Sequence, residues 1–397
     1  MRAVFINHCH PDMDHVCALR MRLFAEAMAE KGHRIVVLSG SLSADSRDLS
    51  MADHRHNLAA HDWSKPYILP CQAAPAALLE RLHQGRLPDG FRQVVVAAGY
   101  LFHGGVFNNW RRGAGSAVRL LAEDFAPDIV WATFGNTDAW NLAQDLAGLA
   151  GCPWVADMKD NWDHYIPGPF RDLLARRYGG AAHFTALSQG HADLVARRFG
   201  VPASVIYSGF GSPRDVAPEA PRIVVSGSIY DGAALAVMVR GIDAWLDEAP
   251  PDRPMEVCYF GNDHQLAETI LAPLDGRCRV LVRSYLEPAE LAPILAGATV
   301  ILCPRHPPML YHHKFGDYMA TGRPVICLPG ETAECRGIAE SINAPLFSCD
   351  TAGQVVSALR AVAANDFPTL DKSLLDAYSW RNQAGALEYL LVRAANR

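Results

Sequence analysis

The chain has 397 residues, of which half are hydrophobic and 20% are charged, and its formal net charge is −6 at pH 7. Single hydrophobic cores stop growing near ~250–300 residues, so this length predicts two domains. The mild acidic excess, together with the lack of lysine or arginine runs, argues against nucleic acid as the main partner. The composition is that of a soluble globular protein.

The sequence carries no pattern typical of export or membrane insertion. The stretch MRAVFINHCHPDMDH reaches polar residues too early for a secretory signal, and no apolar run approaches the ~18–20 residues of a membrane span. Ten cysteines are scattered without a CxxC pair, which is typical of reduced thiols. We therefore expect a cytoplasmic protein.

Short runs rich in valine and isoleucine alternate with amphipathic stretches of helical length. This alternation predicts βα units and parallel sheets covered on both faces. The expected strands are residues 3–6, 35–38, 94–98, 128–131, 154–156, 183–187 and 204–206, then 222–225, 256–260, 279–282, 299–303 and 324–328. We expect helices at 17–31, closed by Gly32, and at the end of the chain over 379–395.

Residues 208–221 read SGFGSPRDVAPEAP and predict a linker between two α/β domains, at 1–207 and 222–378. Residues 41–90 are rich in histidine, proline and polar residues. We expect irregular structure there, with one helix near 75–83.

Ligands of open parallel sheets bind beyond the carboxyl ends of the strands, so the loops after the strands are the places to search. The loop at residues 7–15 contains His8, His10 and His15. Its spacing departs from the HxHxDH zinc signature because Met13 follows Asp12, so we expect substrate contact or a polar loop rather than a metal.

Two further loops contain charged residues, beside a tryptophan in the first loop and at the start of an expected helix in the second. The loop after 154–156 contains Asp157, Lys159, Asp160 and Trp162, which suits contacts to sugar hydroxyls or weak general-base chemistry, or a solvated turn. In the stretch after 299–303, Lys314 and Asp317 lie three residues apart at the start of an expected helix. They fit a diphosphate and a ribose diol, or an ordinary surface ion pair.

Several segments in order resemble the retaining group 1 glycosyltransferases, family four, of GT-B architecture. The segment KFGDYMATGRPV at 314–325 is similar to the family's K-l-f-E-Y-l-a-x-G-r-P-V, VADMKDNW at 155–162 to v-x-D-x-R-D-x-W, and VSGSI at 225–229 to y-x-G-s-l. PDIVW at 127–131 and YSW at 378–380 match further elements. The resemblance implies two facing Rossmann-like domains with a deep interdomain cleft, the last helix packing back on the first domain.

The resemblance also implies roles for individual residues in the transfer of a sugar from a nucleotide-sugar donor to a glycan, lipid-linked or small-molecule acceptor. Donor contacts are expected at Gly227, Ser228, Arg283, Tyr285, Tyr311, His312, Lys314 and Asp317. Acceptor-side contacts are expected at His8, His10, Gly135, Asn136, Lys159 and Trp162, and catalytic roles at Asp157, Asp160 and His15. Retaining members of the family need no metal, so no cofactor is expected.

The sequence departs from the family pattern in places that keep alternatives open. Met309 stands where the first acid of the E-x7-E pair is expected, and no cation follows the strand at 222–225 before Arg240. A sugar-nucleotide epimerase, a phosphorylase or a catalytically silent GT-B-like scaffold are the alternatives. Segments 108–112 and 171–178 mix basic and aromatic residues, as interfacial segments at a membrane and solvated helix faces both do.

Overall fold

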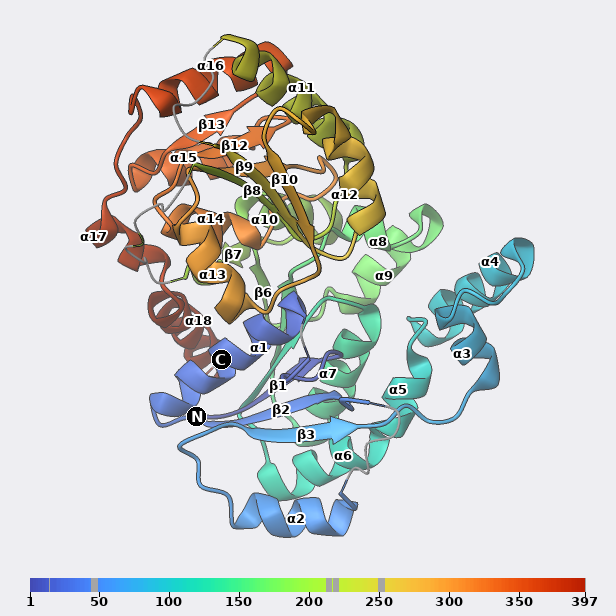
Figure 1. The fold of residues 1–397 in the computed structure, drawn as a ribbon. Coiled ribbons are helices and arrows are strands. Elements are labelled where there is room, and N and C mark those ends of the chain that lie inside the picture. The colour runs from blue at the N-terminus through green and yellow to red at the C-terminus, as the bar shows by residue number, and fades with distance from the viewer. Residues whose placement is uncertain (14, 44–48, 212–215, 217–220, 249–253, 397) are drawn as a thin grey trace. The chain divides into compact units, whose positions relative to one another are not determined.

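The computed structural model describes residues 1–13, 15–43, 49–211, 216, 221–248 and 254–396. The chain forms two compact units, one of residues 1–208 with 380–397 and one of residues 209–379. Most of the expected linker, namely residues 212–215 and 217–220, lies outside the described residues. Each unit is built around one parallel sheet (Figure 1).

The sheet of the first unit has seven parallel strands in the order β3-β2-β1-β4-β5-β6-β7. The strands are β1 (Arg2–Asn7), β2 (Arg34–Gly40), β3 (Tyr67–Cys71), β4 (Ile129–Thr133), β5 (Trp154–Met158), β6 (His183–Ala186) and β7 (Ala203–Val205). The main helices are α1 (Val16–Glu30), α2 (Met51–Ala59), α3 (Ala77–His83), α4 (Asp89–Ala98), α5 (Asn108–Gly113), α6 (Gly115–Leu120), α7 (Thr137–Ala150), α8 (Trp162–Tyr165), α9 (Arg171–Tyr178) and α10 (Gln189–Phe199). Two π-helical turns, η1 (Gly99–His103) and η2 (Leu121–Phe125), follow α4 and α6.

The last helix, α18 (Trp380–Ala395), completes the core of the first unit. Its buried residues Ala384, Leu387 and Leu391 join a cluster with residues of β1, β2 and α1. Trp380 contacts Phe24 of α1 edge to face, with ring centroids 5.4 Å apart. The helix therefore packs against a sheet whose last strand, β7 (Ala203–Val205), ends about 170 residues before Trp380 in the chain.

The sheet of the second unit has six parallel strands in the order β10-β9-β8-β11-β12-β13. The strands are β8 (Arg222–Ser226), β9 (Glu256–Phe260), β10 (Arg279–Arg283), β11 (Val300–Pro304), β12 (Val325–Leu328) and β13 (Leu346–Ser348). The helices are α11 (Gly232–Glu248), α12 (His264–Leu271), α13 (Pro288–Ala296), α14 (Lys314–Ala320), α15 (Ala333–Ser341), α16 (Ala352–Ala363) and α17 (Lys372–Leu375). The core lies between the sheet and helices α11, α12 and α16.

The structure confirms two Rossmann-like sheets of parallel strands, but some element predictions were wrong. Residues 94–98 belong to helix α4 rather than to a strand, and only Val95 of its side chains is buried, whereas Phe91 and Val94 are exposed. A central parallel strand buries both faces, which this segment does not. Residues 41–90 contain helix α2 and strand β3, and Pro70 is tolerated in β3 because that strand is at the sheet edge.

Strand β13 was not predicted from the sequence, because its three residues, Leu-Phe-Ser, contain no valine or isoleucine and are only partly buried. Within the described ranges, no helix combines the length and the apolar character that crossing a membrane requires.

Candidate functional site

The sheet of the second unit has its topological switch point between β8 and β11. These two strands are neighbours, and the connections that leave them run to opposite sides of the sheet, towards β9 and β12. At such a point the loops after the two strands diverge and open a crevice at their carboxyl ends, where nucleotides bind in Rossmann-like sheets. The loop after β8 begins with Gly227, and the segment after β11 leads to Lys314.

Lys314 reaches from the start of α14 to the end of β8. Its Nζ atom donates a hydrogen bond to the carbonyl oxygen of Ser226, 2.7 Å away. A Cβ atom added to Gly227 would lie 1.8 Å from this Nζ, and Gly227 has a φ of +78°. Both the lack of space and the backbone conformation therefore favour glycine at position 227. Burial lowers the pKa of Lys314. The ammonium group therefore lies where two loops of the switch point meet.

Asp317 follows Lys314 by about one helical turn, and its side chain is exposed. A Cβ atom added to Gly211 would lie 3.4 Å from its Oδ1 atom. Ser228, beside Gly227, is also exposed. Lys314, Asp317, Gly227 and Ser228 thus combine a cation, a carboxylate, a hydroxyl and loop backbone around one switch point.

The remaining residues that were expected to contact the donor lie in different surroundings. Arg283 and Tyr285 are exposed at the end of β10, which β9 separates from β8. Tyr311 is buried against Phe315, with ring centroids 5.8 Å apart. The His312 ring contacts Glu331, with its Nε2 2.6 Å from Oε1, so it faces the loop after β12. Tyr311 and His312 therefore shape the segment before Lys314.

The first unit has its switch point between β1 and β4. The loops after β1, β4 and β5 contain the expected acceptor-side residues. Gly135 is exposed after β4, and a Cβ atom added to it would lie 3.8 Å from Oδ2 of Asp160. Asn136 caps helix α7 by accepting hydrogen bonds from the backbone N–H groups of Asp138 and Ala139. The side-chain oxygen of Asn136 is therefore engaged in capping α7.

Lys159 is buried beside Asp160 and Cys17. Its Nζ lies 3.2 Å from Oδ1 of Asp160 and 2.8 Å from Sγ of Cys17. Burial raises the pKa of the Asp160 carboxyl. A hydrogen bond with Cys9 and the nearby ammonium of Lys159 lower the pKa of the Cys17 thiol, against the effect of burial. Cys17 was missed by the sequence reading, because nothing local links it to Lys159.

The three histidines of the loop after β1 have different surroundings. His8 packs against Phe107 and Trp110, and burial lowers its pKa to about 4, so the ring is neutral near pH 7. His10 is buried and accepts a hydrogen bond from the N–H of Asp12. His15 is exposed and caps α1. Asp14 lies outside the described residues.

Asp157 is an internal ion-pair partner rather than a group facing a ligand. The carboxylate is fully buried and pairs with Arg20 of α1, which also contacts Ser208 and the carbonyl of Ile206. Thr133 and Thr185 each donate a hydrogen bond to it at 2.8 Å. These contacts engage both oxygens, so the Asp157 carboxylate stabilises the core of the first unit, and its catalytic role stays a prediction.

Trp162 is likewise a core residue. Its ring is fully buried and packs among aromatic side chains, with centroid separations between 5.1 and 6.4 Å from those of Phe134, Trp140, Tyr178 and Phe199. An acceptor sugar cannot stack on a ring with no exposed face. The expectation of an acceptor platform at Trp162 was therefore wrong.

The two segments considered for membrane contact keep their aromatic rings inside the first unit. Trp110 and Tyr178 are buried, and Arg111 forms a two-point ion pair with Asp145 at 2.6 and 2.7 Å. The large apolar side chains exposed in this unit include Phe91 and Val94 of α4 and Phe102 of η1 instead. The basic and aromatic pattern of 108–112 and 171–178 thus reflects core packing and ion pairing.

Solved structures with the same architecture cover nearly the whole chain. The crystal structure of HepE from Anabaena in complex with UDP and glucose is 13% identical over 99% of this chain and 100% of that chain, with a TM-score of 0.61. Sucrose-phosphate synthase from Thermosynechococcus elongatus is 13% identical over 99% and 98%, with a TM-score of 0.69. A Listeria monocytogenes protein named as a UDP-N-acetylglucosamine 2-epimerase is 13% identical over 98% and 94%, with a TM-score of 0.52. No protein-family model and no curated protein matches the sequence.

The two parallel sheets and these neighbours define the fold of the chain as GT-B. At 13% identity the likeness concerns the fold alone, and proteins named for different reactions share this fold. The chemistry has to be argued from the residues at the two switch points.

Proposed function

We propose that the protein is a glycosyltransferase, which transfers a sugar from a nucleotide-sugar donor to a glycan, lipid-linked or small-molecule acceptor with retention at the anomeric carbon. The observation that carries this proposal is the position of Lys314 against Ser226 and Gly227 at the switch point of the second unit. A cation there, with loop backbone beside it, suits the diphosphate of a nucleotide sugar.

Asp317 supports the same donor class. A carboxylate can accept two hydrogen bonds from a ribose diol while a nearby cation neutralises the diphosphate attached to that ribose. Asp317 is exposed one turn beyond Lys314, which suits this division of roles. One structural neighbour, HepE, was crystallised with UDP and glucose and also with UDP-glucose, which fits a donor of this class.

The expected chemistry of transfer places few demands on protein groups. We propose that the departing diphosphate is stabilised by Lys314 and that the acceptor is oriented by groups of the first unit, with Asp160 and His15 as the candidates for contact with its hydroxyls. The proposal includes no metal in the transfer step. For a lipid-linked acceptor, the exposed apolar residues of α4 and η1 are the surface that favours contact with a membrane.

The donor role of Asp317 is tested with Asp317→Ala. Loss of a charge-assisted hydrogen bond predicts nucleotide binding weaker by at least about 1–2 kcal/mol, roughly tenfold in Kd. The nucleotide is first chosen by a thermal-shift screen of nucleotide sugars and UDP, and Kd is then measured by calorimetry. Asp275→Ala is the matched control, because Asp275 is an exposed acid that precedes the edge strand β10 and so lies at the amino ends of the strands. Equal affinity of Asp317→Ala and the control would contradict the ribose role.

An epimerase is the second candidate, because a GT-B neighbour carries that name. Incubation with the nucleotide sugar alone separates the two reactions. An epimerase converts its substrate without an acceptor, whereas a transferase needs one and releases the nucleotide. A phosphorylase requires inorganic phosphate, and a silent scaffold binds no nucleotide sugar in the thermal-shift screen.

A further inference from the structure

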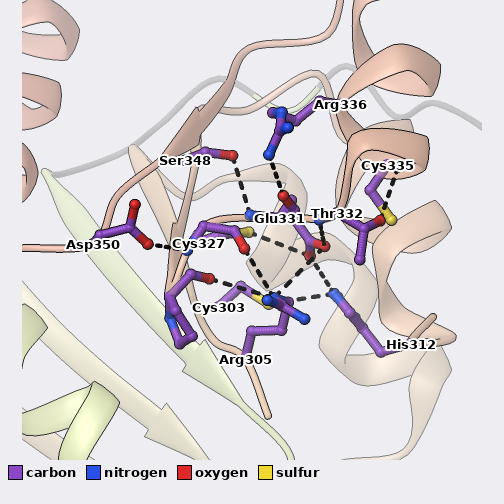
Figure 2. Close-up of polar contacts among 12 residues, drawn as sticks. Cys303, Arg305, His312, Cys327, Glu331, Thr332, Cys335, Arg336, Ser348 and Asp350 are labelled. Carbon is purple, nitrogen blue, oxygen red and sulfur yellow. Dashed lines mark hydrogen bonds and ion pairs between the residues drawn. The ribbon is translucent and has the colours of Figure 1, made fainter. Parts of the chain in front are cut away.

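Four side chains with metal-binding chemistry meet inside the second unit, at the carboxyl ends of β11 and β12 (Figure 2). Cys303 of β11 and Cys327 of β12 are direct partners in the parallel register, so their side chains leave the same face of the sheet side by side. His312 comes from the segment after β11, and Glu331 from the loop after β12. Two loops and two strands thus converge on one point.

The atoms that face this point are close together. The ligand atoms of Cys303, His312 and Glu331 all lie within 4.8 Å of one another. Sγ of Cys303 is 3.6 Å from Nε2 of His312, and Sγ of Cys327 is 3.7 Å from Oε1 of Glu331. The same Oε1 is 2.6 Å from Nε2 of His312. All but His312 are buried, and the His312 side chain is only 15% exposed.

Three of the separations between these atoms can be compared with the edges of a tetrahedral zinc site. Zinc bonds of about 2.3 Å to sulfur and about 2.0–2.1 Å to nitrogen or oxygen place neighbouring ligand atoms about 3.3–3.6 Å apart. The 3.6 Å contact between Cys303 and His312 lies within this range, and the 3.7 Å contact between Cys327 and Glu331 is about 0.1 Å longer. The contact between His312 and Glu331 has to lengthen by roughly 0.7 Å, which a small rotation of either side chain provides.

The surroundings orient and neutralise such a site. Oε2 of Glu331 accepts a hydrogen bond from the N–H of Thr332 and lies 3.9 Å from Arg305, and Arg336 donates to the Glu331 carbonyl (Figure 2). Two thiolates and one carboxylate are balanced by a divalent cation together with the Arg305 guanidinium. Outer contacts of this kind hold metal ligands in place.

We propose that Cys303, Cys327, His312 and Glu331 bind one zinc ion, which ties the loops after β11 and β12 together. Sulfur, imidazole and carboxylate ligands favour zinc over magnesium or calcium, which prefer oxygen. His312 lies two residues before Lys314, so the ion fixes the start of α14. The site is structural, is separate from the transfer step and does not depend on the proposed function.

A second group, Cys9, His15 and Cys17 of the first unit, has similar chemistry but a different environment. The ammonium of Lys159 lies 2.8 Å from Sγ of Cys17 and already compensates a thiolate there. A divalent ion beside that ammonium is disfavoured by charge repulsion. This group therefore serves as an internal comparison for the experiment.

The test is the metal content of the full-length protein, purified with a reductant and without chelators or a histidine tag. Elemental analysis is expected to find about one zinc per chain. After removal of the zinc, titration with Co²⁺ is expected to give the near-ultraviolet charge-transfer band of cobalt thiolates, saturating at about one equivalent. A wild-type protein with neither bound zinc nor this band overturns the proposal.

Variants locate the ion. Cys303→Ser and His312→Asn are expected to lower bound zinc at least tenfold, and the second variant changes a partly exposed ring, so it keeps the test open if the first misfolds. Cys278→Ser, at a partly buried cysteine of the same unit, and the double variant Cys9→Ser with Cys17→Ser are expected to keep the ion. Retention in His312→Asn, or loss in the Cys9 and Cys17 variant, contradicts the assignment.

Discussion

At the scale of single residues, the proposed donor site depends on one close approach between a lysine and a glycine. Nζ of Lys314 occupies the space that a side chain at position 227 would fill. The hydrogen bond to Ser226 holds the ammonium there. A sequence can predict that Lys314 starts a helix after a strand. The space at Gly227, however, depends on β8 and β11 being neighbours, and their paired residues are 77 positions apart in the chain.

Gly227→Ala is expected to weaken nucleotide binding at least tenfold, because the added methyl group displaces the Lys314 ammonium. Gly276→Ala is the matched control. Its φ is +77° against +78° for Gly227, so the backbone strain is the same, but nothing lies within 4 Å of the added Cβ. Calorimetry on both variants separates displacement of Lys314 from backbone strain. Similar losses of affinity in the two would remove Lys314 from the explanation.

Asp157 shows how a residue expected to act on substrate can instead support the fold. Replacing Asp157 with alanine leaves the Arg20 guanidinium buried without its carboxylate partner. Breaking one side of a buried ion pair costs about 3–5 kcal/mol, so urea unfolding of Asp157→Ala should show a loss of this order in the first unit. Nucleotide affinity in the second unit should be unchanged. A fully stable but inactive variant would restore the catalytic interpretation.

At the scale of elements, buried strands with continuous apolar runs were predictable from the sequence, but an apolar run did not always form a strand. β1, β4 and β8 are buried on both faces, and valine and isoleucine identify them locally. The Val94-Val95-Val96 run has the same composition but lies on helix α4 with one buried side chain. Its helical state depends on packing against α3 in a small satellite cluster, which no local pattern shows.

The loops of the candidate site were likewise only partly predictable from the sequence. The loops after β1, β4, β5, β8 and β11 could be predicted as ligand positions, because the carboxyl ends of parallel strands meet at one edge. The sequence could not predict which side chains of these loops point outwards. Trp162 turns into an aromatic cluster, and His312 turns towards Glu331 from the next loop.

At the scale of the molecule, the two compact units do not coincide with two continuous stretches of chain. Helix α18 follows the second unit in sequence but contributes Leu387 and Leu391 to the core of the first (Figure 1). The stability of the first unit therefore depends on residues at the end of the chain.

Leu387→Ala is expected to destabilise the first unit by about 2–5 kcal/mol, because it leaves a cavity at a fully buried position. Hydrogen exchange followed by mass spectrometry should show faster exchange in β1, β2 and α1, with β8 and β11 unchanged. Tyr389→Ala, at an exposed position of the same helix, is the control. Faster exchange in the second unit instead would mean that α18 supports that unit.

The sequence by itself determined the two α/β domains and most of the parallel strands, and it located the loops after these strands as candidate ligand positions. These follow from local composition and from the alternation of strand and helix patterns. Only the tertiary structure decided that Arg20 pairs with Asp157 and that Lys314 meets Gly227. It also decided that Cys303, His312 and Glu331 meet after β11 and β12, with Cys327 beside Glu331. Strand order and side-chain burial bring such residues together, and both depend on contacts between distant parts of the chain.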